Sequence, residues 1–155
     1  SIGLEVDHEI QMGAVFAPLL NDLYFAKKDQ GAFKNGIKIA TSNISQLSEA
    51  MVSTGFSCLR DNLEQNNLER FSRIAQKTMG QRRFGSAALD FCTVADGQVD
   101  IFWEQRLNLF DIAAGVLIVK EAGGTITDFS GEEKLNPEAI LATNSNLLKE
   151  ILAYI

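Results

Sequence analysis

The segment from Gly85 to Asp128 constrains the fold most, because its pattern predicts a helix, a strand and a second helix in close succession. Apolar residues recur at helical spacing after Gly85 and stop at Gly97, a residue type that commonly ends helices. Alternation from Val99 to Glu104 then predicts a short strand with the glutamate at its exit.

A second apolar run follows Asp111 and ends at Gly123 and Gly124, which predicts a buried helix with a glycine stop. We therefore expect Asp111 at a helix N-terminus. Its position there, seven residues after Glu104, would let the two carboxylates face a common cleft.

The chain before this segment reads as antiparallel strands. Residues Ser1 to Val6, Glu9 to Phe16 and Leu23 to Lys27 predict three strands joined by short connections. Asn35 and Gly36 predict a two-residue hairpin turn, since both residues of such a turn need positive φ angles. We expect residues 1–40 to form antiparallel strands of a first sheet.

Strands and helices alternate in the remainder, so residues 41–155 are expected to form an α/β layer pair. Beyond the central segment, the expected strands are 50–56, 125–129 and 139–142. The expected helices are a long one, capped by Asp61 or Asn62 and ended by Gly80, and a last one over 145–154.

Composition excludes several classes of function. The net charge of −6 disfavours a nucleic-acid partner, and basic residues are clustered only in pairs. Cys58 and Cys92 lie among apolar residues, which favours buried free thiols in a reducing compartment. With no membrane-length apolar run and no signal-peptide pattern, the sequence predicts a cytoplasmic protein with no membrane partner. It begins within a strand-like pattern and without an initiator methionine, so we expect it to belong to a longer protein.

Asp111 is the sharpest candidate for chemistry. A carboxylate beside a loop at a helix N-terminus can coordinate a hard cation, but aspartate is also a favoured N-cap residue. Glu104 could accept a hydrogen bond from a polyol hydroxyl, although a glutamate at a strand end is often a solvated surface group.

Gly85, Ser86 and Ala87 at a helix start could bind an anion or a hydroxyl, because unpaired N–H groups point outward there. A purely structural role, with Ser86 as N-cap, is equally physical. Arg82 and Arg83 could line an anionic site or form a solvated face, and His8 is expected to be exposed in a hairpin turn.

The motifs GSAALDFCTVADGQVD, the following WE, and FDIAAGVLIVKEAGGTITDFSG resemble the C-terminal signature of the inositol monophosphatase family. The first 36 residues also resemble that family. The resemblance implies a layered α/β (α+β) sugar-phosphatase fold with an incomplete first layer. It also implies Mg²⁺-dependent hydrolysis of a phosphomonoester, with myo-inositol monophosphate as the typical substrate.

Carried over by motif, Asp111 resembles an aspartate that binds a metal and approaches the substrate. Glu104 resembles the acid that contacts an inositol hydroxyl, and Gly85, Ser86 and Ala87 resemble the segment that contacts the sugar. The family's Trp before the aspartate is Phe110 here, a change expected to have little effect.

The family's other metal ligands lie in a Gly-Glu-Glu element and an Asp-Pro-Ile-Asp-Gly-Thr element that precede the first strand, and neither occurs there. Gly131, Glu132 and Glu133 follow the signature instead, as a chance match. We therefore expect the chain by itself to be inactive, and prone to aggregation through uncovered strand faces.

Two further functions stay open. One is a fructose-1,6-bisphosphatase-like or dual-specificity sugar phosphatase, and the other is a non-catalytic binding or dimerisation module. The resemblance implies a small-molecule sugar or inositol phosphate as ligand and a homodimer as the assembly.

Overall fold

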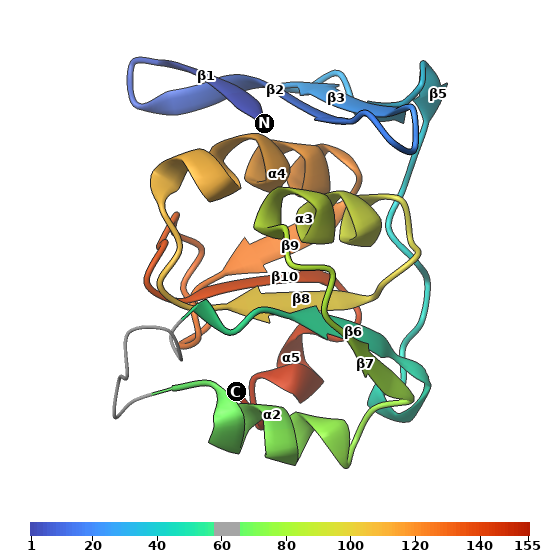
Figure 1. Cartoon of the computed structure of the whole chain (residues 1–155), viewed down its shortest axis with the longest axis vertical. Coiled ribbons are helices and arrows are strands. Elements are labelled where there is room, and N and C mark those ends of the chain that lie inside the picture. The colour runs from blue at the N-terminus through green and yellow to red at the C-terminus, as the bar shows by residue number, and fades with distance from the viewer. Residues whose placement is uncertain (58–65) are drawn as a thin grey trace.

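The chain folds into four stacked layers. A computed structural model describes residues 1–57 and 66–155, in which a sheet, a helix pair, a second sheet and a second helix pair follow one another (Figure 1). The N-terminus lies beside the first sheet and the C-terminus beside the last helix pair (Figure 1). This arrangement confirms the predicted α/β architecture.

The first sheet is an antiparallel meander whose spatial order follows the chain. Positive φ angles at Asn35 (50°) and Gly36 (79°) form the predicted hairpin turn, and those at Asp7 (51°) and His8 (63°) form another. The three longer strands that the sequence predicted are therefore confirmed. The strands are β1 (Ile2–Val6), β2 (Glu9–Ala17), β3 (Asp22–Lys27), β4 (Ala32–Lys34) and β5 (Ile37–Lys38).

Helices α3 (Ala87–Ala95) and α4 (Leu109–Glu121) lie between the two sheets. Contact between β2 and α4 is close enough that a methyl group at Gly13 would collide with the backbone of Ala114. Gly115 of α4 likewise leaves room for the ring of Phe91 on α3. Glycines thus set the spacing of the layers that meet here.

The second sheet has the order β7-β6-β8-β10-β9, with parallel pairing of β6 to β7 and β8 and antiparallel pairing elsewhere. Its central strand β8 is covered on both faces, because Phe102 packs against α3 and Trp103 joins a cluster on the opposite face. The strands are β6 (Met51–Thr54), β7 (Gly80–Arg82), β8 (Ile101–Glu104), β9 (Gly124–Thr127) and β10 (Ile140–Asn144).

The last layer contains α2 (Leu68–Ala75) and α5 (Leu148–Ile151), and a short 3₁₀ helix, η1 (Leu47–Glu49), precedes β6. Two predictions about this part were wrong. Gly80 begins strand β7 instead of ending a helix, because residues 80–82 pair with β6. The last helix is shorter than predicted, because the Asn144 side chain accepts a hydrogen bond from the Leu147 N–H and holds residues 145–147 in a turn.

Some predictions fall outside the described residues, namely Cys58 and the helix cap at Asp61 or Asn62. Cys92 is buried and free, as predicted. None of the helices in the described ranges is both long and apolar enough to span a membrane.

The first sheet carries exposed apolar residues, in contrast to the second. Ile2, Leu4 and Val6 of β1 are 74%, 48% and 48% exposed, and Phe16 of β2 is 52% exposed. Helices cover only the face of this sheet that points toward α3 and α4 (Figure 1). The first layer is therefore incomplete in the described part of the chain.

Candidate active site

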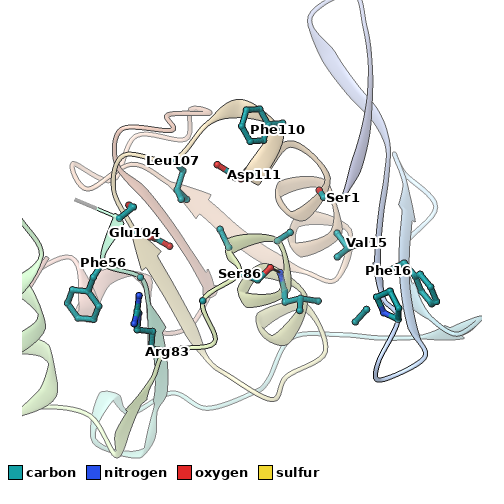
Figure 2. Close-up of a pocket in the computed structure, with 18 residues that line it drawn as sticks. Ser1, Val15, Phe16, Phe56, Arg83, Ser86, Glu104, Leu107, Phe110 and Asp111 are labelled. Carbon is teal, nitrogen blue, oxygen red and sulfur yellow. Dashed lines mark hydrogen bonds between the residues drawn. The ribbon is translucent and has the colours of Figure 1, made fainter. Parts of the chain in front are cut away.

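A pocket of about 660 Å³ opens where β2, the first turns of α3 and α4, and the end of β8 meet (Figure 2). All five residues that the sequence singled out line it: Gly85, Ser86, Ala87, Glu104 and Asp111. They come from three elements that are separate in the chain. The fold therefore brings the whole predicted set to one place.

The first turn of α3 forms one wall of the pocket. Ser86 is the N-cap, with extended backbone angles, and its hydroxyl accepts a long hydrogen bond from the Leu89 N–H at 3.5 Å. Gly85 has a φ of 83°, a conformation that L side chains rarely adopt. N–H groups in this turn have no intrahelical acceptor, so the wall offers donors to an oxygen-rich ligand while Ser86 also caps the helix.

Glu104 lies on the floor of the pocket and is only 6% exposed, so it is not the solvated strand-end group that remained one interpretation of the sequence. Burial raises the pKa of its carboxyl group, and the charge of Asp111 raises it further, while Ser57 and Arg83 act in the opposite direction. A methyl group at Gly55 would overlap the Glu104 carboxylate. The glycine backbone therefore holds this acid in place.

Asp111 lies on the rim, at the third position of α4 and not at the N-cap. Asn108 is the N-cap, because α4 begins three residues earlier than the sequence suggested. Asp111 Oδ2 accepts hydrogen bonds from the Asn108 N–H at 2.8 Å and from Asn108 Nδ2 at 3.2 Å. Within the described part of the chain, Oδ1 accepts no hydrogen bond and remains available to a ligand.

Mg²⁺ is commonly held by one or two carboxylates together with waters and substrate phosphates. Asp111 fits one position in such a set, because one of its oxygens is anchored to the helix and the other points away from that anchor. Residues 1–57 and 66–155 contain no group of three or more His, Cys, Asp or Glu side chains able to hold a metal. Among the described residues, Asp111 is thus a candidate for one ligand of such a set.

Sequence reasoning missed other members of the pocket. Gly55, Phe56 and Ser57 line it directly after β6. Arg83, which the sequence offered either for an anionic site or for a solvated face, also lines the pocket, and its guanidinium carbon lies 5.9 Å from the centroid of the Phe56 ring. Figure 2 shows Arg83 and Phe56 on the side of Glu104 opposite Asp111. A glycine at the end of an apolar strand was the available signal for this loop.

The remaining sequence candidates lie elsewhere. His8 is exposed in its hairpin turn, as predicted, 3.7 Å from a Glu5 carboxylate oxygen. Gly131, Glu132 and Glu133 lie between β9 and β10 and do not line the pocket, which agrees with a chance match. Asp128 accepts a hydrogen bond from the Ser130 N–H at 2.8 Å and is a turn residue.

Comparison with known proteins decides the family. A model of the inositol monophosphatase family matches residues 1–155. The chain belongs to the inositol monophosphatase family. The predicted family and fold are therefore confirmed.

Relatives include a putative Nus factor SuhB of Neisseria meningitidis serogroup B, 41% identical over 147 residues, which cover 94% of this chain and 56% of the relative. An inositol-1-monophosphatase of Caulobacter vibrioides is 38% identical, and the match covers 98% of this chain and 61% of that relative. The chain thus spans a little over half the length of these relatives.

Solved structures of family members share the fold. The inositol monophosphatase of Anabaena (Nostoc) superposes with a TM-score of 0.94 at 35% identity, and the match covers 98% of this chain and 61% of that one. The extragenic suppressor protein suhB of Bartonella henselae superposes with a TM-score of 0.91 at 32% identity, with coverage of 98% and 58%. Both matches extend over all four layers of this chain.

Proposed function

We propose that the protein in which this chain occurs is a Mg²⁺-dependent phosphomonoesterase that hydrolyses a myo-inositol monophosphate. One observation carries the proposal: Glu104, Asp111 and the Gly85–Ala87 turn line a single pocket. Family membership supports a phosphatase, and the arrangement of acceptors and donors suits a ligand that combines hydroxyl groups with a phosphate.

The two carboxylates divide the work. Asp111 would hold the Mg²⁺ through Oδ1, and a bound Mg²⁺ supplies Lewis acidity and lowers the pKa of a coordinated water. Glu104, buried beside Gly55, accepts a hydrogen bond from a ring hydroxyl and so fixes the orientation of the sugar. The small residues Gly85, Ser86 and Ala87 let the ring approach the first-turn N–H groups of α3.

A substrate panel with the protein tests this proposal. Phosphate release from myo-inositol 1-phosphate, fructose 1,6-bisphosphate, 3′-phosphoadenosine 5′-phosphate and histidinol phosphate is measured with Mg²⁺ and with EDTA. We expect the highest kcat/KM for the inositol phosphate and loss of turnover in EDTA. Preference for fructose 1,6-bisphosphate would favour the alternative sugar phosphatase, and turnover that survives EDTA would contradict the metal assignment.

A binding module is the second candidate, favoured by the name Nus factor SuhB of the Neisseria relative at 41% identity. In that case the pocket would be a remnant, and the function would lie in contacts with a protein partner or a second copy. Absence of phosphate release from every substrate in the panel, by a folded protein supplied with Mg²⁺, would favour this function.

Three further expectations accompany the proposal. We expect the 155-residue chain by itself to release little phosphate, because its described residues provide only part of a metal site. We also expect a homodimer and a cytoplasmic location. Sedimentation analysis and cell fractionation of the protein measure the last two.

A further inference from the structure

A second buried acid lies beneath the pocket. Asp90, on α3, is 1% exposed, and it shares the space between α3 and the second sheet with Ser53 of β6 and Glu104 of β8. Ser53 pairs with Phe102 in the sheet, and Phe102 faces α3, so Ser53 faces α3 as well. Glu104, two residues beyond Phe102, faces the same side.

Asp90 lacks the partners that a buried carboxylate needs. Among the described residues, neither its Oδ1 atom nor the Ser53 hydroxyl oxygen has a hydrogen-bond partner, and both atoms are buried. Among the described residues, no lysine, arginine or histidine pairs with Asp90. An ionised carboxylate in such a place is costly unless it is paired, whereas a neutral acid is tolerated and can donate a hydrogen bond.

Electrostatics of the site agree with a neutral Asp90. Burial raises its pKa to about 7, and the neighbouring charge of Glu104 raises it as well, while the Ser53 side chain and the Ser86 backbone act in the opposite direction. The other elements packed on α3, namely α4, β2 and β10, contribute apolar side chains to the surrounding cluster, such as Ile112, Val15 and Ala142. Glu104 is the charged group that the described residues place against Asp90.

We propose that Asp90 is a positioning residue for Glu104: as a neutral acid directed toward Ser53, it leaves Glu104 as the single charged acceptor on the pocket floor. Ionisation of Asp90 would place a second negative charge beneath Glu104, and the repulsion between the two carboxylates would displace Glu104 from the position in which it accepts the polyol hydroxyl. This inference rests on the proposed role of Glu104, and it adds a residue that does not itself line the pocket.

The kinetic test measures KM and kcat of the protein for myo-inositol 1-phosphate between pH 6 and pH 8.5. We expect KM of the wild type to rise roughly 10-fold over this range, as a second buried charge near Glu104 would cause. Asp90→Asn, which stays neutral, should abolish that rise, and Asp90→Ala should raise KM at every pH. Equal pH profiles for the wild type and Asp90→Asn would overturn the proposal.

The matched control is Asp96→Asn, which changes a largely buried acid at the other end of α3. Asp96 accepts a hydrogen bond from the Tyr24 hydroxyl at 3.0 Å and lies away from the pocket lining. We expect this variant to keep the wild-type pH profile of KM. A flattened profile in Asp96→Asn would show that any lost acid on α3 has this effect, and the proposal would fail.

A second measurement is independent of turnover. Carboxyl ¹³C NMR of the protein follows Asp90 and Glu104 from pH 4 to pH 9. We expect Asp90 to titrate near neutral pH, and Asp90→Asn to change the titration of Glu104. An Asp90 that is ionised throughout pH 5–8, or a Glu104 titration that Asp90→Asn leaves unchanged, would overturn the inference. Either result can be obtained even if the panel of substrates contradicts the proposed phosphatase.

Discussion

The floor and the rim of the pocket are built in different ways. On the floor, Glu104 is 6% exposed, and Asp90, which lies beneath the floor between α3 and the second sheet, is 1% exposed. On the rim, Asp111 lies in the first turn of α4 beside Phe110, which is 73% exposed. A buried acceptor suits the orientation of a rigid ring, and an accessible carboxylate suits a hydrated cation. Under the proposed function, substrate recognition and metal binding would therefore depend on separate parts of the fold.

Asp111→Asn removes the carboxylate charge on the rim and should have the largest effect on activity. We expect kcat to fall about 100- to 1,000-fold. Loss of the charge of a proposed Mg²⁺ ligand should lower activity more than loss of a group that only orients such a ligand, which typically lowers activity about 10- to 100-fold. Steady-state kinetics at saturating Mg²⁺ measure it. Asn108→Ala is the control: it removes the Nδ2 hydrogen bond to Asp111 Oδ2 but keeps the backbone N–H bond and the carboxylate, so most of kcat should survive. Equal losses in both variants would indicate a capping role only.

Asp90→Asn tests whether Asp90 is neutral in the folded protein, through the pH dependence of the free energy of unfolding. The pKa of Asp90 rises from 3.8 to about 7 on folding. Between these values the unfolded chain releases the proton and the folded chain keeps it, so the free energy of unfolding should fall as pH rises from 4 to 7 and then level off. Denaturant titration should show that the variant loses this contribution, roughly 2–4 kcal/mol between pH 4 and pH 8. An unchanged pH dependence would mean that Asp90 is ionised in the folded protein.

Gly55→Ala displaces the acceptor on the floor without changing any charge. The new methyl group would overlap the Glu104 carboxylate, so we expect KM for the inositol phosphate to rise about 10-fold, as for the loss of one charged hydrogen bond. Gly80→Ala is a matched control, because a methyl group there meets Met51 at an ordinary 3.5 Å. Similar KM values for Gly55→Ala and the wild type would show that Glu104 does not contact the substrate.

Phe110→Trp should have the smallest effect. The Phe110 side chain is largely exposed, so the larger indole ring has room on the rim. We expect kcat and KM to stay within about twofold of the wild type. A change of 10-fold or more would place the residue before Asp111 in direct contact with the substrate.

Much of the fold could be predicted from the sequence, because its signals are local. Asn35 and Gly36 specify a hairpin turn, and Gly97 and Gly123, with φ angles of 73° and 87°, follow the ends of α3 and α4. Strand β7 escaped prediction because its three residues, Gly80–Arg82, carry no apolar alternation and form a strand only by pairing with β6.

Five residues of the candidate site could be predicted from the sequence, but the surroundings of their side chains could not. The motif resemblance led to Glu104 and Asp111, yet the burial of Glu104 depends on contacts with residues distant in sequence, such as Gly55. Asp90 lies within an apolar helical run, and nothing in the sequence around it indicates a role in the site. Its importance depends on β6 and β8 passing beneath α3, which no local pattern encodes.

The most direct test of the separation between floor and rim is a crystal structure of the protein with Mg²⁺ and myo-inositol 1-phosphate bound. We predict a Mg²⁺ ion about 2.1 Å from Asp111 Oδ1 and a ring hydroxyl within hydrogen-bond distance of the Glu104 carboxylate. A metal bound away from Asp111, or a sugar that does not touch Glu104, would contradict the account.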